Sequence, residues 1–378
     1  MWKLVSVITG MFLLGAGSIV TGAGHALDDF PLDVAQARPG YEFSFPEDHG
    51  SHDAFRTEWW YFTGHLFGED GRRFGYELTF FRRAVDLPHG LDNPSAWAIR
   101  QLYFAHSAVN DEHNEQFQFA EKLSRAGLGK AGAQSGFLDV WIDEWVCKAV
   151  SADHRVIQLH ADAETFSLDL HVSPQKPPVI HGTHGVSVKG LLPGQASHYY
   201  SLSRLSTEGM LNIHGEEVLV KGLSWMDHEF GSGELGDDQV GWDWFSIQLE
   251  GDIEIMIYQL RKHDGSPDAV SSGTMVFPDG TTQHLSLKAI HITVQDIWES
   301  PVTKAQYPSK WQVRIPSLEL ALVVVPRLPN QELVTHRSTQ VAYWEGAVDV
   351  AGEFQGKATT GMGYVELTGY AKPLRKAY

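Results

Sequence analysis

Three consecutive ionisable side chains, Asp227, His228 and Glu229, form the segment of the sequence best suited to acid–base chemistry. A strand through them would place the two carboxyl groups on one face and the imidazole on the other. Burial raises the pKa of a carboxylic acid and can leave it protonated near neutral pH. Such a group can donate a proton to a weakly basic substrate as a general acid. A solvated turn or an interdomain salt bridge would also explain these residues, because structural ion pairs collect perturbed carboxylates too.

Two short segments are dense in aromatic residues. Their sequences are EWWYF at 58–62 and WDWF at 242–245. On a strand, each segment would present large rings on both faces. The rings could fill a core, where aromatic side chains dominate burial. They could also line a pocket for an apolar or carbocationic ligand, because ring faces stabilise positive charge.

Three further strings resemble functional motifs, and we interpret them as loops. GLGKAG at 127–132 and GSGELG at 231–236 have GxGxxG spacing, but neither leads from a strand into a helix, as a dinucleotide site requires. His181 and His184 have HxxH spacing in a Gly/Pro-rich loop, without an obvious third ligand. The single cysteine, Cys147, excludes an intramolecular disulfide and is interpreted as a buried side chain. We therefore expect no cofactor and no metal.

Apolar and polar residues alternate in many short segments, which predicts half-buried antiparallel strands. Examples are segments 74–80, 166–172 and 253–257, and turn sequences such as 69–71 and 278–280 recur between them. Short helices are expected only near 121–127 and 87–97. The predicted fold class is all-β, in barrels or sandwiches. The length favours two domains, which we place at residues 27–230 and 231–378.

The N-terminus has the layout of a secretory signal peptide. Lys3 precedes an apolar run to Val20, and small residues follow as far as Ala26, so residues 1–26 are predicted to be a signal peptide. The alternative is an uncleaved membrane anchor, since the run approaches the length that spans a bilayer. We expect the protein to be periplasmic or secreted. Its formal net charge of −18 argues against nucleic acid as a partner.

Eight strings spread from about residue 41 to 373 resemble the AttH-like/CrtC-type family, which includes the acyclic carotenoid 1,2-hydratases. The strings are EWWYFTGH at 58–65, YELTFFR at 76–82, SHYYSLSR at 197–204, WMDHEFG at 225–231, GWDWFSIQL at 241–249, YQLR at 258–261, YWEG at 343–346 and GYVELTGY at 363–370. The resemblance implies two lipocalin-like antiparallel β-barrel domains packed together.

The resemblance also implies a chemistry. Carotenoid hydratases protonate an isolated double bond, form a tertiary cation and capture it with water. The matching positions here are Asp227 and His228, with Phe230 where a Trp is expected in the hydratases and Gln259 where an acid is expected. Bacterial AttH-like members are commonly encoded beside ABC-transporter permeases, so the resemblance implies such a permease as a partner.

We consider two main functions. The first is an exported protein that binds a hydrophobic, lipid- or isoprenoid-like small molecule inside its barrels. The second is a lyase that hydrates or cyclises an isoprenoid alkene. Barrels filled by their own side chains would leave a third option, an interaction module. The expected catalytic residues are Asp227, His228 and Tyr258, and the expected ligand-binding residues are Glu58, Trp59, Tyr61, Tyr200, Trp225, Trp242 and Trp244.

Overall fold

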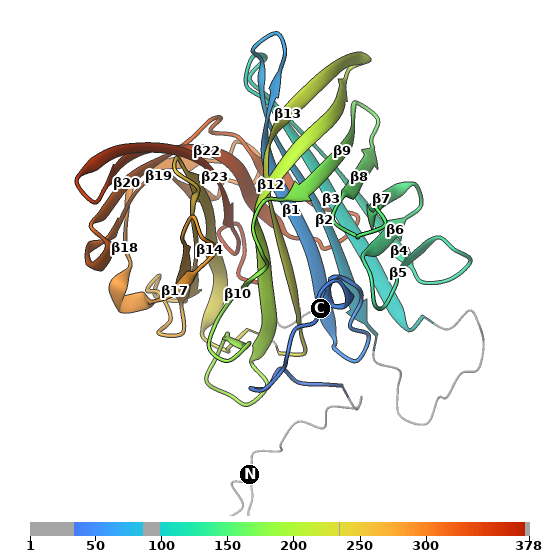
Figure 1. Cartoon of the computed structure of the whole chain (residues 1–378), viewed down its shortest axis with the longest axis horizontal. Helices are drawn as coiled ribbons and strands as arrows, with labels where there is room; N and C mark the ends of the chain where they lie inside the picture. The colour runs from blue at the N-terminus through green and yellow to red at the C-terminus, as the bar shows by residue number, and fades with distance from the viewer. Residues whose placement is uncertain (1–33, 86–98, 234, 375–378) are drawn as a thin grey trace, which may run out of the picture.

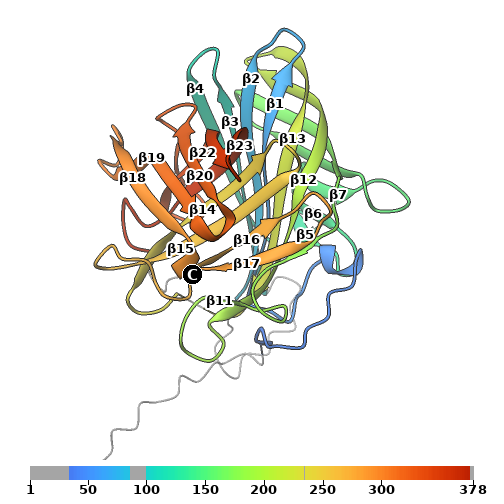
Figure 2. The ribbon, with the colours of Figure 1, turned by 60° about the vertical axis from the view of Figure 1, so that its left-hand side comes forward.

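The computed structural model describes residues 34–85, 99–233 and 235–374. These residues form two antiparallel sheets that lie side by side, one a nearly closed barrel and the other a half-barrel (Figures 1 and 2). The prediction of an all-β protein with two lipocalin-like domains is therefore confirmed. The helices in this part of the chain are three short turns, η1 (Glu47–His49), η2 (Leu287–Ala289) and η3 (Pro316–Leu318), and none of them could cross a membrane.

The first sheet contains strands β1 to β13, in the order β4-β3-β2-β1-β13-β12-β9-β8-β7-β6-β5, with β10 and β11 paired to β12. The strands are β1 (Thr57–Gly68), β2 (Arg73–Ala84), β3 (Gln101–Asp111), β4 (Gln116–Arg125), β5 (Ala131–Ala133), β6 (Asp139–Ile142), β7 (Trp145–Ala149), β8 (Ile157–Asp162), β9 (Phe166–Pro174), β10 (Val179–Ile180), β11 (Ser187–Val188), β12 (Ala196–Ile213) and β13 (Glu216–Gly231). Strands β3 and β4 also contact β6 from the other end of the sheet, so the sheet curls back on itself.

The second sheet contains strands β14 to β23, in the order β17-β16-β15-β14-β23-β22-β20-β19-β18, with β21 paired to β22. The strands are β14 (Gln239–Leu249), β15 (Ile253–Lys262), β16 (Ser272–Val276), β17 (Thr282–Ser286), β18 (His291–Glu299), β19 (Gln306–Ile315), β20 (Leu320–Pro326), β21 (Glu332–Val334), β22 (Ala342–Phe354) and β23 (Lys357–Leu367). The change of sheet falls between Gly231 and Gln239.

The segments predicted to be strands from their alternation lie in β2, β9 and β15. The helix expected near 121–127 is wrong, because residues as far as Arg125 belong to β4 and pair with β3. Phe117 and Phe119 in β4 continue the period of two, and pairing along the whole strand outweighs the local helix propensity. The other expected helix, near 87–97, and the predicted signal peptide lie outside the described residues.

Each domain has a core packed with its own side chains. The first core includes Trp60, Phe62 and Cys147, and the second includes Phe245 and Trp311. Because side chains alternate along a strand, residues between these core positions point to the opposite face. On both sheets that opposite face meets the other domain, which gives the junction a set of side chains distinct from either core.

The junction is closed by a third apolar cluster and by hydrogen bonds between the domains. Strand β1 contacts β23, and β2 contacts β22. The hydroxyl of Tyr61 donates to Glu345 Oε1 at 2.6 Å, and His65 Nε2 lies 2.7 Å from the carbonyl oxygen of Gly363. The cluster consists of Tyr61, Tyr199, Trp225, Trp244, Met256, Tyr258, Leu260, Ala347 and Tyr364. These contacts hold the two sheets face to face.

Candidate active site at the domain junction

A cavity of about 700 Å³ lies at the junction of the two domains, outside both barrel cores. Its surface is mostly apolar, and its size suits a drug-sized ligand. The aromatic residues that line it are Trp59, Tyr61, Phe81, Phe104 and Tyr199 from the first domain and Trp242, Trp244, Tyr258 and Tyr343 from the second. The ligand space is thus between the barrels rather than inside one, where the sequence analysis placed it.

Asp227 on β13 lines this cavity and is almost completely buried. Its Oδ2 accepts a hydrogen bond from the Tyr199 hydroxyl at 2.6 Å, and its Oδ1 accepts from Trp225 Nε1 at 2.6 Å and from the Ser201 hydroxyl. Burial raises the pKa of Asp227 to about 7, against these three hydrogen bonds, which favour the ionised form. Asp227 is therefore protonated in a large fraction of the molecules at neutral pH, as a general acid requires.

The imidazole linked to Asp227 belongs to His181 rather than to His228. His181 Nε2 lies 2.6 Å from Ser201 Oγ, and its Nδ1 lies 2.8 Å from Thr274 Oγ1. Burial lowers the pKa of His181 to about 3, so the ring is neutral at pH 7. A neutral ring that donates Nε2–H to Ser201 leaves the Ser201 hydroxyl free to donate to Asp227. Sequence analysis treated His181 only as half of an HxxH string and did not identify this role.

Glu229 lies two residues from Asp227 on the same face of β13 and also lines the cavity. Lys189 Nζ lies 3.0 Å from Glu229 Oε1, and the Ser197 hydroxyl donates to the same oxygen. Burial lowers the pKa of Lys189, but the charge and hydrogen bond of Glu229, together with Tyr258 and Asp227, outweigh this and raise the pKa overall. The Lys189 ammonium also lies 4.2 Å from the centre of the Tyr258 ring. Glu229 therefore has a cationic partner, whereas Asp227, its neighbour on the strand face, is hydrogen-bonded only by neutral donors.

Three more carboxyl groups reach the cavity from strands, namely Glu77 on β2, Glu345 on β22 and Glu366 on β23, and the exposed Asp237 lines it from the segment before β14. Burial raises the pKa of Glu77 to about 7, that of Glu366 to about 8 and that of Glu345 well above its usual range. Tyr61 donates to Glu345, and Trp242 Nε1 donates to Glu366 Oε2 at 2.7 Å. All three groups can therefore be uncharged near neutral pH.

Sequence analysis missed these three glutamates, as well as Lys189 and Tyr199, as candidate site residues, and it named Glu229 in the acid–base segment without including it among the expected catalytic residues. A signal for most of them was present, because positions two apart on a strand share a face. Glu229 follows Asp227 at that spacing, and Glu345 and Glu366 lie in strings that were used only to identify the family.

Six of the ten residues proposed from the sequence line the cavity, and four do not. Those that do are Trp59, Tyr61, Asp227, Trp242, Trp244 and Tyr258. Trp225 lies behind Asp227 as its hydrogen-bond donor. Glu58, Tyr200 and His228 lie on the core-facing side of their strands. Alternation explains the difference, because Glu58 and Trp59, or Asp227 and His228, are sequence neighbours and cannot share a face.

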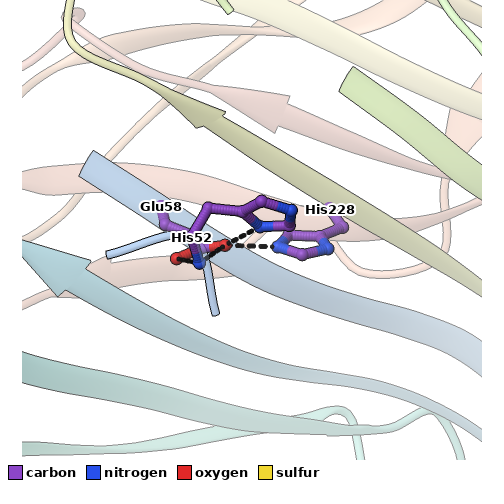
Figure 3. A group of neighbouring side chains, drawn as sticks. All are labelled: His52, Glu58 and His228. Atoms are coloured by element: carbon purple, nitrogen blue, oxygen red, sulfur yellow. Dashed lines mark hydrogen bonds and ion pairs between the residues drawn. The ribbon is translucent and has the colours of Figure 1, made fainter. Parts of the chain in front are cut away.

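Glu58 instead organises a cluster beside the first core, drawn in Figure 3. Its Oε1 accepts from His52 Nδ1 at 2.8 Å and from His228 Nε2 at 2.9 Å, and its Oε2 accepts from Arg82 Nε at 2.9 Å. Although burial opposes ionisation, these imidazoles and the Arg82 charge hold the pKa of Glu58 well below its usual range. On the other side of His228, the Tyr200 hydroxyl lies 3.0 Å from Nδ1.

The same three residues, His52, Glu58 and His228, have ligand atoms within 4.8 Å of one another, a spacing that could hold a metal ion. Both carboxylate oxygens of Glu58 already accept hydrogen bonds from nitrogen donors, and Arg82 already supplies a positive charge. We therefore assign the cluster a structural role, in which it ties the loop around His52 to β1 and β13.

A family model described as AttH-like matches residues 36–370. The chain belongs to the AttH-like family. This confirms the resemblance inferred from the eight sequence strings. Among curated relatives of this AttH-like protein is dehydratase asqC from Emericella nidulans, which is 27% identical over 251 residues. The alignment covers 64% of this chain and 66% of the relative, so the chain spans just under two thirds of that relative's length.

Solved structures resemble the AttH-like protein over nearly its whole length. A crystal structure described as an AttH from Nitrosomonas europaea has a TM-score of 0.80 and 34% identity, over 89% of this chain and 99% of the other. Kievitone hydratase from Nectria haematococca has a TM-score of 0.68 over 90% of this chain and 98% of the other. Its identity of 16% supports a shared fold alone. Together, the family and its dehydratase relative support a hydratase-like or ligand-binding role.

Proposed function

We propose that this AttH-like protein is a hydro-lyase that adds water to, or removes it from, an apolar isoprenoid-like substrate in the junction cavity. The observation that carries the proposal is the position of Asp227, a buried carboxyl group in the wall of an aromatic cavity, whose pKa burial raises to about 7 and which lies beside the ion pair of Glu229 and Lys189. The dehydratase and hydratase names of two similar proteins support the same class of reaction.

The two carboxyl groups can divide the proton transfers of hydration between them. Asp227 gives its proton to one alkene carbon, and the π electrons form the new C–H bond. The other alkene carbon becomes a cation, to which the oxygen of a water molecule adds. Glu229 takes the surplus proton from that oxygen, and a proton returning from Glu229 to Asp227 restores the starting state. Dehydration follows the same steps in reverse, so that Asp227 is left protonated and water is released.

The cavity walls suit the intermediate of this reaction. Trp59, Trp242 and Trp244 present rings to the cavity, and aromatic faces stabilise a developing cation. Apolar walls also exclude bulk water, so that proton donation takes place in a low-dielectric site where electrostatic effects are larger.

Turnover of simple isoprenoids in isotopically labelled water tests the proposal. The alkene myrcene and the tertiary alcohol linalool differ by one water molecule, and mass spectrometry after incubation in H₂¹⁸O detects reaction in either direction. We expect the purified protein to incorporate the label, and Asp227→Asn to slow the reaction roughly 10²- to 10⁴-fold. Asp169→Asn, which changes a carboxylate on β9 remote from the cavity, is the matched control and should react at the wild-type rate.

Two results would contradict this function. If Asp227→Asn kept the wild-type rate, Asp227 would not be the acid. If the wild-type protein bound both isoprenoids in the cavity but formed neither ¹⁸O-labelled linalool from myrcene nor myrcene from linalool, addition or removal of water would not be its reaction with this substrate class.

Binding without chemistry is the second candidate, and the mostly apolar cavity surface favours it. In this case, solvent extraction of the purified protein followed by mass spectrometry should release a lipid or isoprenoid. Consistent absence of such a ligand, together with failure to bind an apolar fluorescent probe, would exclude this candidate. Export and a link to an ABC-transporter permease stay predictions from the N-terminal sequence and the family resemblance.

A further inference from the structure

The junction cavity carries an excess of acidic groups. Six of its lining residues have carboxyl groups, and two are lysine or arginine. The acidic residues are Glu77, Asp227, Glu229, Asp237, Glu345 and Glu366, and the basic residues are Arg83 and Lys189. Lys189 is paired with Glu229, so its charge is already balanced. Although Glu77, Glu345 and Glu366 can be uncharged near neutral pH, each has a proton that it can release when a cationic ligand binds, and none of them gains charge that would attract an anionic ligand.

Two of these carboxyl groups present buried oxygens that accept no hydrogen bond in the described structure, Glu77 Oε2 and Glu345 Oε2. Both residues are only 1% exposed. Their other oxygens are occupied, because Thr79 donates to Glu77 Oε1 at 2.7 Å and Tyr61 donates to Glu345 Oε1. A buried polar atom without a partner is unfavourable and rare in folded proteins. A hydrogen-bond donor on a ligand in the cavity would satisfy both oxygens.

Glu77 and Glu345 belong to different domains, and both line the cavity from strands that contact each other across the junction. Strand β2, which holds Glu77, contacts β22, which holds Glu345. The Tyr343 hydroxyl lies 3.5 Å from Glu77 Oε1, and Tyr343 precedes Glu345 by two residues on the same face of β22. Burial, followed by the charges of Glu366 and Glu77, raises the pKa of Glu345, which shows that the three carboxyl groups are close enough to interact.

We propose that the cavity selects an apolar ligand that carries a basic amine, with the ammonium group placed between Glu77 and Glu345. An ammonium group has hydrogen-bond donors for both free oxygens and no acceptor. Its bonds to carboxylates are charge-assisted, and such bonds are about twice as strong as neutral ones. The rings of Tyr61 and Tyr343, which come from the same two walls, add cation–π attraction.

A hydroxyl group could reach one of the two oxygens, but it has a single donor and no charge. When an ammonium ion binds, ionising Glu77 beside it costs little free energy at neutral pH, because the pKa of Glu77 is about 7. A ligand carboxylate is ionised at neutral pH and has no hydrogen-bond donor for either oxygen. This order of preference, amine before alcohol before acid, is the expected specificity of the cavity.

The inference rests on the cavity being the binding site of the proposed function, but not on proton transfer by Asp227. It is tested by three probes that share one apolar ring system: 1-naphthylmethylamine, 1-naphthalenemethanol and 1-naphthoic acid. Isothermal titration calorimetry at pH 7 should give the amine an affinity about tenfold higher than that of the alcohol, since a hydrogen bond to a charged group contributes roughly 1.5–3 kcal/mol. The acid should bind most weakly.

Variants then localise the preference. Glu345→Gln and Glu77→Gln each keep the side-chain shape and should reduce the ratio of amine to alcohol affinity to near one. Glu250→Gln makes the same side-chain replacement at an exposed position just after β14, outside the cavity lining, and should keep the full preference. The comparison of probes on the wild-type protein stays informative even if one variant folds poorly.

Failure of this inference can be distinguished from failure of the proposed function. Equal binding of the amine and the alcohol to the wild-type protein would overturn the amine inference and leave the hydro-lyase proposal standing. Loss of the preference in Glu250→Gln would overturn it as well, because the effect would then come from net charge. If none of the three probes bound, both the inference and the use of this cavity would be wrong.

Discussion

Glu58 and Asp227 are two buried carboxyl groups on adjacent strands of the same sheet, and their pKa values are shifted in opposite directions. Both accept several hydrogen bonds. The donors to Glu58 include the Arg82 guanidinium and the His52 imidazole, whose own pKa is raised overall by its bonds to Asp48 and Glu58 despite the opposing effect of burial. The donors to Asp227 are two hydroxyl groups and an indole N–H, all neutral.

The difference shows what decides the protonation of a buried acid in this protein. Neutral hydrogen bonds oppose the effect of burial on Asp227 without overcoming it, whereas donors that carry charge overcome it at Glu58. Alternation along β13 separates the two environments, since His228 faces the Glu58 cluster while Asp227 faces the cavity. One strand thus carries both a structural ion cluster and a candidate proton donor.

The largest effect is expected from removing the charge at Glu58. Glu58→Gln leaves the Arg82 guanidinium buried without its counter-charge, and breaking a buried pair in this way costs about 3–5 kcal/mol. Urea unfolding at pH 7 should show this loss of free energy of unfolding. Asp227→Asn, measured in parallel, should lose far less, because it removes a group without a cationic partner. Equal losses in the two variants would contradict the comparison.

The pH dependence of stability should also separate the two groups. An aspartic acid in the unfolded chain has a pKa of about 3.9, so between about pH 4 and 7 folded Asp227 keeps a proton that the unfolded chain has released. Its contribution to stability is complete below pH 4 and is lost as the pH rises through 7, by up to about 1.4 kcal/mol per pH unit.

Asn at position 227 cannot titrate. The free energy of unfolding of the wild type should therefore fall relative to that of Asp227→Asn as the pH rises over this range.

Glu58 has a lowered pKa and acts in the opposite sense, because its contribution to stability is present above about pH 4.3 and is lost as the pH falls. Denaturant titrations from pH 4 to 8 measure the trend for Asp227, and titrations below pH 4 measure that for Glu58. A difference between wild-type and Asp227→Asn that stays flat across the range would show that Asp227 is ionised in the folded state.

The alkaline side of the activity profile should report the Asp227 proton. If Asp227 is the acid, kcat/KM for the hydration of myrcene falls about tenfold for each pH unit above about 7, since the ionised form has no proton to give. Asp169→Asn should have the same profile as the wild type. A rate that rises with pH through this range would indicate a base rather than an acid as the essential group.

The smallest effect is expected at Ser201. Its hydroxyl donates to Asp227 and favours the ionised form, so Ser201→Ala should raise the pKa of Asp227 further. One such hydrogen bond contributes roughly 0.5–1.5 kcal/mol, which corresponds to a shift of up to about one pH unit in the alkaline limb of the activity profile. The shift should be toward higher pH, and a shift toward lower pH would contradict the assigned direction of the hydrogen bond.

Sequence patterns predicted the strands of this protein well and the site only in part. The alternation in segments 74–80 and 253–257 is visible because each strand has one face in a core, and this gave the fold class. The same period separates Asp227 from His228, so the sequence indicated that these two residues lie on opposite faces of their strand. It could not indicate which face meets the second domain, because that depends on how two completed sheets pack.

Two features of the site depend on long-range packing. Tyr61 and Glu345 are far apart in sequence, and only the contact between β1 and the second sheet brings them into a hydrogen bond. His181 reaches Asp227 through Ser201 because strand β10 lies along β12, a pairing of two residues that leaves almost no periodic pattern. The position of the cavity between two filled barrels follows from the same packing.

Because two domains line the cavity, the residues for the proposed proton transfers and many of the residues for ligand recognition come from different domains. The proposed proton-transfer groups, Asp227 and Glu229, belong to the N-terminal domain, while Glu345, Trp242 and Trp244 reach in from the C-terminal domain. Mutations in the second half can therefore remodel what is recognised without replacing Asp227 or the three residues that donate hydrogen bonds directly to it. A chimaera that joins this N-terminal half to the C-terminal half of a relative would be a direct route to new substrates.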